Sequence, residues 1–271
     1  MTHNVWPFLG SLGRLVEVPF TASESVSGGP RYVERATVEG RRRVQALPSP
    51  PRSWSIDVSG ATSSELSSVS GFLSGAWGAG PWHWVPVQAQ RGNMLTPGEA
   101  SLVDRVTRPE WVTGAPEFTV DGWVPSTLVN GMSSGAGSVA TYIPVLPEKP
   151  VTFAADLLGN GTVAPTLTVA FYDAAGVSVG SGTYLAPVAP GWVRASFTRP
   201  VPAGAVHMNL GIGYQTRRMA RPQVTWTDGP VPFSAGHGCR AAIIDGWSED
   251  LIVANRYGTY SSAGFTVLEV S

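Results

Sequence analysis

The stretch Leu167-Thr168-Val169-Ala170-Phe171-Tyr172, followed by Asp173-Ala174-Ala175-Gly176, decides the fold class. Its β-branched and aromatic residues predict a strand, and the Asp and Gly that follow predict a tight turn. Similar segments recur at short intervals between residues 100 and 228, which is the spacing of a β-sandwich or jelly roll. Asn160-Gly161 predicts a second hairpin turn. The other strands predicted in this region are 139–145, 151–157, 177–184, 192–198, 206–213 and 223–226.

The two ends of the chain also predict strands, with one helix between them. The capping-box pattern Thr62-Ser63-Ser64-Glu65, followed by apolar residues at helical spacing, predicts one short helix, which could be the only one. Three apolar strands at the C-terminus are too few to form a domain alone, so they need the N-terminal strands as partners. The strands predicted at the ends are 15–20, a hairpin over 32–47, 54–58, 80–87, 239–245, 251–255 and 265–270.

The composition agrees with an all-β protein and excludes several functions. Charged residues make up 14% of the 271 residues, below the roughly 25% that is usual. Gly (32) and Pro (23) are abundant, which favours turns and strands. A net charge of −1 gives no broad electrostatic field, which argues against a mainly electrostatic nucleic-acid or membrane-surface binder and favours association. With four His and one Cys, we expect no disulfide framework, no metal site and no cofactor.

The chain has no apolar run long enough to cross a membrane. Its first residues, Met1-Thr2-His3-Asn4, lack the basic and apolar parts of a signal peptide. We therefore expect a soluble protein that is made in a cytoplasm.

Two stretches carry a resemblance to a known family. Pro51-Arg52-Ser53-Trp54, Gly75 to Trp82 and Asn93-Met94-Leu95-Thr96-Pro97 resemble the N-terminal part of minor tail proteins from siphophages of actinobacteria. Residues 236–261 and 265–270 resemble the other end of the same domain. The resemblance implies one discontinuous tail domain, 1–97 and 229–271, with a module inserted at 98–228.

The insert resembles carbohydrate-binding modules with a galactose-binding-like jelly roll. The resemblance rests on Val145 to Ala155, Leu167 to Gly176, Gly191-Trp192-Val193-Arg194 and Val201 to Ala205. The expected fold class is therefore a discontinuous all-β sandwich tail domain with one short helix, plus an inserted jelly-roll sandwich.

Among tail proteins the layout is most similar to the distal tail protein. That resemblance implies a virion protein of the tail tip or baseplate, built as an oligomeric, hexameric ring. The ring would join the tail tube to the tip, contact the tape measure and tip proteins, and present a module for host attachment. Two alternatives stay open: a receptor-binding minor tail protein outside the ring, and a monomeric carbohydrate-binding protein.

Sugar recognition needs flat aromatic faces and neighbouring hydrogen-bonding groups. Rings near strand ends or turns of the insert, with polar residues close by, are the candidate contacts to host glycan. They are Trp123, Tyr184, Tyr214, Asp121, Asn130 and Gln215. Trp192 lies in the structural run of the module family and is expected in the core. If no glycan binds, the insert would be a spacer or decoration.

Two further groups are candidates for subunit contacts. Trp77, Trp82 and Trp84 lie on a Gly- and Pro-rich segment and could bury against a neighbouring subunit or in their own core. Arg41, Arg42 and Arg43 could meet an acidic partner, face a subunit, or stay solvated.

An enzyme is not expected. Gly176-Val177-Ser178-Val179-Gly180 matches the nucleophile motif of α/β-hydrolases, with Asp228 and His237 following in the order of that family. The motif requires a sharp strand-to-helix turn, whereas the sequence here predicts a hairpin strand. No catalytic or metal-binding residue is therefore nominated.

Overall fold

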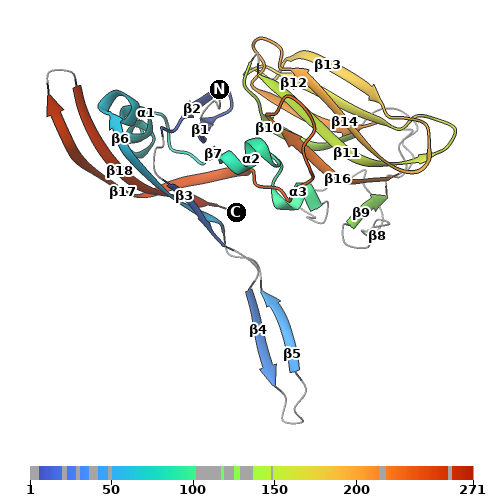
Figure 1. Cartoon of the computed structure of the whole chain (residues 1–271), viewed down its shortest axis with the longest axis horizontal. Coiled ribbons are helices and arrows are strands. Elements are labelled where there is room, and N and C mark those ends of the chain that lie inside the picture. The colour runs from blue at the N-terminus through green and yellow to red at the C-terminus, as the bar shows by residue number, and fades with distance from the viewer. Residues whose placement is uncertain are drawn as a thin grey trace. The chain divides into compact units, whose positions relative to one another are not determined.

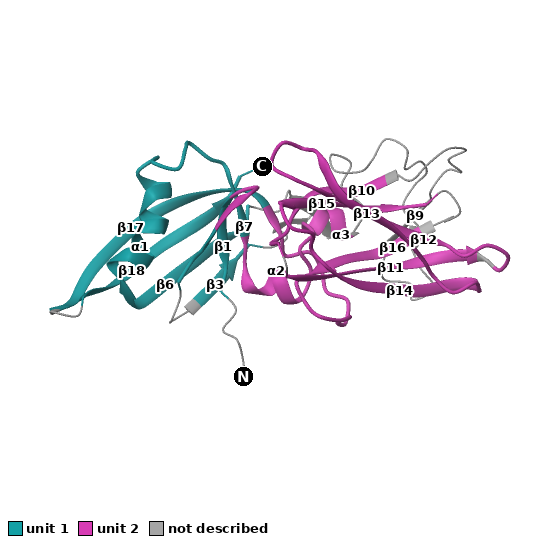
Figure 2. Cartoon of the chain, turned by 90° about the horizontal axis from the view of Figure 1, so that it is seen from above, with its two compact units in different colours: residues 1–10, 16–84, 240–271 teal, residues 11–15, 85–239 magenta. Residues whose placement is uncertain are grey.

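The computed structural model describes residues 6–19, 23–28, 31–36, 42–47, 51–101, 117–118, 125–128, 137–147, 149–213, 218–255 and 258–270. The structure is mostly strand (57%, with 10% helix), and its described residues form curled antiparallel sheets and three short helices, so the predicted all-β class is confirmed. It divides into two compact units, coloured separately in Figure 2. Unit 1 comprises residues 1–10, 16–84 and 240–271, and unit 2 comprises residues 11–15 and 85–239.

Unit 1 is built on a seven-stranded sheet with the strand order β2-β1-β7-β17-β18-β6-β3. β4 and β5 pair only with each other and form a separate two-stranded ladder (Figure 1). This ladder is the predicted hairpin over 32–47, and its turn lies outside the described residues. The elements of this unit are β1 (Phe8–Ser11), β2 (Arg14–Glu17), β3 (Ser23–Ser27), β4 (Arg31–Ala36), β5 (Arg42–Leu47), β6 (Ser53–Thr62), α1 (Ser63–Leu73), β7 (Trp82–Val85), β17 (Cys239–Asn255) and β18 (Gly258–Glu269).

The core of unit 1 lies between the sheet and α1. Trp54, Ile56 and Val58 alternate with exposed residues along β6, so one face of this strand is buried. The predicted capping box is present at the start of α1: Glu65 N–H donates to Thr62 Oγ1 (3.3 Å), and Thr62 N–H donates to Glu65 Oε2 (2.8 Å).

The prediction of three C-terminal strands is wrong, because the described residues of this region form two strands. β17 runs unbroken from Cys239 to Asn255 and pairs with β18. The polar stretch between the two predicted strands continues the ladder through a register shift between Asp245 and Ser248, where Gly246 has a φ of +67°. A glycine tolerates this conformation, so the strand bends without ending.

Unit 2 is a sandwich of two sheets. One has the order β10-β15-β12-β13, and the other has the order β14-β11-β16-β9-β8. Leu167, Val169 and Phe171 of β12 are buried toward the interior, as are Phe153 and Leu157 of β11. The elements are α2 (Val87–Arg91), α3 (Pro97–Ser101), β8 (Glu117–Phe118), β9 (Pro125–Leu128), β10 (Gly137–Pro144), β11 (Pro150–Asn160), β12 (Thr166–Tyr172), β13 (Ser178–Leu185), β14 (Pro190–Pro200), β15 (His207–Ile212) and β16 (Arg218–Thr225).

The two turns predicted for this unit have different outcomes. The turn at Asp173–Gly176 is confirmed: Asp173 Oδ1 accepts from the N–H groups of Ala175 (2.9 Å) and Val177 (2.8 Å). The hairpin at Asn160-Gly161 is wrong, because β11 and β12 belong to different sheets and the segment between them connects the two layers. The short helices α2 and α3 were not predicted from the sequence.

Candidate functional site

The candidate site lies on the outward face of the four-stranded sheet of unit 2. Because Leu167, Val169 and Phe171 point inward, the alternate residues Thr168, Ala170 and Tyr172 of β12 point outward. Residues paired across antiparallel strands share a face, which adds the following outward residues: His207, Asn209 and Gly211 of β15, and Ser181 and Thr183 of β13.

A bulge in β10 brings an exposed tyrosine onto this face. The register between β10 and β15 shifts between Ala140 and Ile143, and Tyr142 lies within the shift with a φ of +55°. Its backbone N–H donates to Asn209 Oδ1 (3.1 Å), while the residue stays 58% exposed. A bulky residue at this φ is an outlier that costs about 1–3 kcal/mol, and such costs gather at functional sites.

Three rings stack at this bulge. The His207 ring lies against the Tyr172 ring at 5.1 Å between centroids and 11° between planes. The Tyr142 ring lies 5.0 Å from the His207 ring, tilted by 33°. We call Tyr142, Tyr172 and His207 the Tyr142 cluster. It forms an aromatic patch whose outer member is open to solvent.

His207 is the buried member of the cluster. The residue is only 6% exposed, and its Nδ1 has no hydrogen-bond partner. Burial lowers the pKa of His207 below its ordinary value, and the nearby Asp173 carboxylate acts in the opposite direction. The imidazole is therefore held in its neutral form near pH 7, as an uncharged ring between two phenols.

The face next to the cluster is polar but small. Asn209 supplies an amide, and Thr168, Ser181 and Thr183 supply hydroxyl groups. Ala170, which lies between them on β12, has only a methyl side chain. Aromatic faces beside hydroxyls and amides are the groups that bind the apolar and polar sides of a sugar ring.

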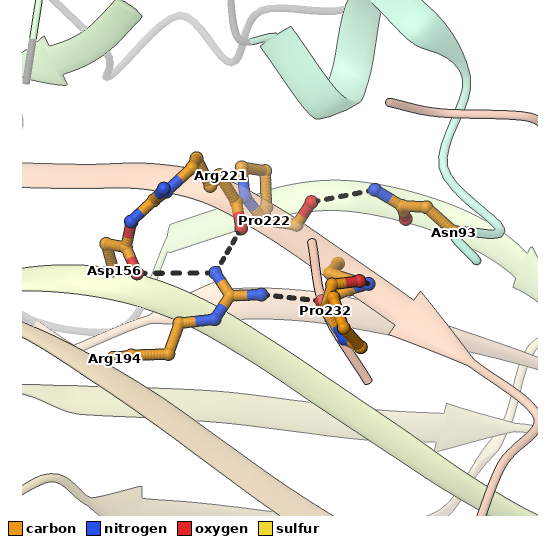
Figure 3. A network of polar contacts seen from close by, with 7 residues as sticks. Asn93, Asp156, Arg194, Arg221, Pro222 and Pro232 are labelled. Atoms are coloured by element: carbon orange, nitrogen blue, oxygen red, sulfur yellow. Dashed lines mark hydrogen bonds and ion pairs between the residues drawn. The ribbon is translucent and has the colours of Figure 1, made fainter. Parts of the chain in front are cut away.

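The second sheet of the same sandwich has a different polar arrangement, shown in Figure 3. The buried carboxylate of Asp156 pairs with Arg221 and, at 3.4 Å, with Arg194. Arg194 also donates to the carbonyl oxygen of Arg221 (2.7 Å) and to Gln223 Oε1 (2.6 Å). Burial lowers the pKa of Arg194, and Asp156 opposes that change. These side chains satisfy one another, so we interpret them as structural.

Two amides extend this network to segments that precede and follow the sandwich strands. Gln223 Nε2 donates to the carbonyl oxygens of Gly92 (2.7 Å) and Pro232 (3.0 Å). The buried Asn93 Nδ2 donates to the carbonyl oxygens of Pro222 (3.0 Å) and Ser234 (3.2 Å). Residues 85–97 and 229–239 are consequently part of unit 2 in the structure. The assignment of the two units to a tail domain and an inserted module stays a prediction.

Of the glycan contacts predicted from the sequence, Tyr184 lies within the described residues. Its ring packs against Phe153 (5.0 Å) and Phe197 (4.9 Å) of the opposite sheet, and its hydroxyl accepts from Arg199 Nη1 (2.5 Å). Tyr184 therefore closes the edge of the sandwich. The other five candidates, Asp121, Trp123, Asn130, Tyr214 and Gln215, lie outside the described residues.

The candidate interface tryptophans are in three different environments. Trp84 is fully buried, and its ring packs edge-on to Trp54 (6.3 Å). Trp82 is buried against Phe72 (5.0 Å). Trp77 is 53% exposed, and its Nε1 donates to the Ser68 carbonyl oxygen (3.2 Å).

Of the three arginines predicted as possible partner contacts, two lie within the residues that the structure describes. Arg42 and Arg43 belong to β5, where their backbones pair with Ala36 and Arg35 of β4. Arg41 lies outside the described residues.

The hydrolase motif lies in the hairpin between β12 and β13. Gly176 is in the turn, with a φ of +77°, and Ser178 is the first residue of β13. The strand-to-helix turn that this nucleophile needs is replaced by a strand-to-strand turn. Within the described part of the chain, no group of His, Cys, Asp and Glu could hold a metal ion. No helix in that part is long and apolar enough to span a membrane.

The sequence reasoning missed the Tyr142 cluster. Tyr172 and His207 each lie inside a predicted strand, and nothing in their immediate sequence marks them as ligand contacts. Tyr142 also lies in a predicted strand, and only the bulge turns its ring toward His207. The available signal was the concentration of rings in three strands that turn out to be neighbours.

No family model matches this sequence, and no curated protein sequence matches it. Solved structures similar to the chain include the enzymatically active domain of tailspike protein 4 of bacteriophage CBA120, at 14% identity and a TM-score of 0.38. The match covers 50% of this chain and 21% of the tailspike chain.

Two bacterial structures are also similar. One is the N-terminal part of endo-1,4-β-D-xylanase 10B of Clostridium thermocellum, complexed with xylohexaose, at 17% identity and a TM-score of 0.32, over 46% of this chain and 26% of that one. The other is a carbohydrate-binding module of lichenase 5A from Cellvibrio mixtus, complexed with cellotriose, at 14% identity and a TM-score of 0.31, over 44% and 93%. The chain spans about a fifth to a quarter of the tailspike and xylanase chains. Likenesses at this level do not define a shared function.

Proposed function

We propose that this protein is a structural subunit of a phage tail whose unit 2 binds a host-surface glycan through the Tyr142 cluster. The observation that carries the glycan part is the exposed Tyr142 side chain, held at a costly φ with its ring tilted against the His207 ring at 5.0 Å. Arg221 of β16 also has a positive φ, but its side chain is paired with Asp156, whereas the Tyr142 side chain is held at the surface. The resemblance of the sequence to carbohydrate-binding jelly rolls points to the same class of ligand.

The glycan part is tested by measuring binding of the full chain to host cell walls and to an array of purified polysaccharides. Tyr142→Ala should weaken binding by about fivefold to thirtyfold, because a sugar-stacking ring contributes on the order of 1–2 kcal/mol. Val188→Ala, at an exposed site in the segment between β13 and β14 rather than on the four strands of the face, is the matched control and should bind as the unchanged chain does. Equal binding by Tyr142→Ala would reject the cluster as the site.

The tail part of the proposal rests on the resemblance of both chain ends to minor tail proteins. It predicts an oligomer, as a ring at the tail tip requires, and unit 1 offers a surface for a second copy. Leu251, Ile252 and Val253 of β17 are 63%, 53% and 45% exposed in succession. β7 has four residues against seventeen in β17, so among the described strands part of that edge of β17 has no neighbour. An open edge with exposed apolar residues favours pairing with another chain.

Sedimentation velocity over a range of concentrations, with electron microscopy of the particles, tests the oligomer. The unchanged chain should form closed rings, and Leu251→Asn with Val253→Thr should shift it toward the monomer. Val188→Thr, an exposed apolar site elsewhere, is the control. Monomers at every concentration and in isolated tails would favour the alternative, a monomeric carbohydrate-binding protein.

A further inference from the structure

The strands that form the candidate glycan face contain no charged residue. None of the residues of β10, β12, β13 and β15 is Asp, Glu, Lys or Arg. Surfaces of soluble domains usually carry roughly a quarter to a third of such residues. The absence of charge therefore marks this face as different from an ordinary solvated surface.

Asp173 is an acidic residue beside the face, and its carboxylate is already hydrogen-bonded. Asp173 follows β12, and its Oδ1 accepts two backbone N–H groups of the turn. His207, the titratable base on the face, is held neutral by burial. The two other rings of the cluster, Tyr142 and Tyr172, add no acidic or basic group to the described part of this face.

The lack of charged residues on these strands favours uncharged glycans over anionic ones. A uronate, sulfate or phosphate group brought to the face would lose water without gaining a cation from these four strands, and it would approach the carboxylate of Asp173. An uncharged sugar loses less, since its hydroxyls can pair with Asn209, Thr168 and Ser181 while its ring face lies on Tyr142.

The small side chains give the ligand room. The row Asn209, Ala170 and Ser181 runs across three strands, and the next row is Gly211, Thr168 and Thr183. We propose that this face binds an uncharged glycan, lying over these rows with one ring stacked on Tyr142, and discriminates against anionic glycans. The inference rests on the proposed glycan function of the Tyr142 cluster.

A protein strand is the other occupant that an uncharged sheet could take, by pairing with the free edge of β13. The glycan is favoured because the exposed ring and the polar groups lie on the face of the sheet, whereas strand addition would use the edge. The experiment below separates the two.

The test uses the full chain and matched polysaccharides: a β-glucan, a galactan and a mannan, each as the neutral polymer and as its carboxymethylated derivative. Calorimetry at low and high salt should show binding to at least one neutral polymer, with an affinity that does not change with salt. The carboxymethylated partner should bind at least about tenfold more weakly. Ser181→Asp should strengthen this discrimination, and Val188→Asp, outside the face, should leave it unchanged.

Two results would overturn the inference in different ways. Equal or tighter binding of the anionic polymers, lost on Tyr142→Ala, would contradict the charge selectivity and leave the glycan function in place. If no polysaccharide bound, and host cell walls were still bound after periodate had destroyed their sugars, both the selectivity and the glycan function would fail, and a protein partner would be indicated.

Discussion

The two sheets of unit 2 enclose one core, but their polar residues are arranged in opposite ways. The five-stranded sheet contains Asp156, Arg194 and Arg221, which pair with one another and are tied to flanking segments through Gln223. The four-stranded sheet contains no Asp, Glu, Lys or Arg, and it presents an exposed ring and a stacked histidine whose Nδ1 has no partner. Charge that is paired around the buried Asp156 carboxylate supports the fold, whereas an uncharged face with an exposed ring favours binding.

The largest effect on stability is expected in the five-stranded sheet, at Asp156. Asp156→Ala removes the carboxylate that both guanidinium groups face, and it should lower the free energy of unfolding by about 3 kcal/mol. Urea unfolding followed by tryptophan fluorescence measures this change. Ser181→Ala, at an exposed position of the open sheet, is the control and should change stability by less than about 0.5 kcal/mol. A loss as small as that for Asp156→Ala would erase the contrast between the sheets.

The next effect concerns the amide that holds the flanking segments. Asn93→Ala should cost about 2 kcal/mol, because it leaves the carbonyl groups of Pro222 and Ser234 and the N–H groups of Leu95 and Val224 without this partner. Hydrogen exchange should show faster exchange at Leu95 and Val224. Unchanged protection of both amides would mean that Asn93 is not needed to hold these segments.

In the four-stranded sheet, a substitution at Tyr142 should change glycan binding strongly and stability only a little. Tyr142→Gly removes a stacked ring, worth about 0.5–1.5 kcal/mol, but also relieves a φ that costs about 1–2 kcal/mol. The melting temperature should therefore change little, while glycan binding is lost. A strongly destabilised variant would indicate that Tyr142 is a structural residue, and the four-stranded sheet would then have no binding role to contrast with the five-stranded sheet.

The smallest effect is the pH dependence of the histidine. Because burial lowers the pKa of His207 in the folded chain, the unfolded chain takes up this proton first as the pH falls. Its contribution to stability is complete above about pH 6.5 and is lost as the pH falls from there toward the folded pKa. Thermal unfolding between pH 7.5 and 5 should show this loss, and His207→Gln should reduce it. Identical pH profiles would contradict the burial of a neutral imidazole.

Much of the fold followed from residue patterns, and the exceptions have physical causes. Strands such as β12 have alternating apolar residues, and α1 has its capping box, so local pattern and final structure agree. The five-residue helices α2 and α3 are too short for a helical periodicity to appear in the sequence. Asn160-Gly161 has the residues of a hairpin turn, but the sheet that each flanking strand joins depends on distant partners.

The candidate site was less predictable than the fold. Ring-bearing residues near strand ends were the predicted contacts, and Tyr184 shows why this was insufficient, since its ring packs between the sheets and its hydroxyl is bonded to Arg199. The Tyr142 cluster depends on the bulge in β10 and on the register of β15 with β12. Both features depend on how the strands pair, which the sequence of a single strand does not determine.

The central claim is that unit 2 binds a glycan on its uncharged face, and mapping the bound ligand by NMR tests it most directly. The full chain, labelled with ¹³C in the rings of tyrosine and histidine, would be titrated with the tightest-binding polysaccharide fragment from the panel. The account predicts that the ring signals of Tyr142, Tyr172 and His207 shift with one saturating affinity, while the ring of Tyr184 at the sandwich edge does not respond. Saturable binding that shifts Tyr184 and leaves the Tyr142 cluster unchanged would contradict it.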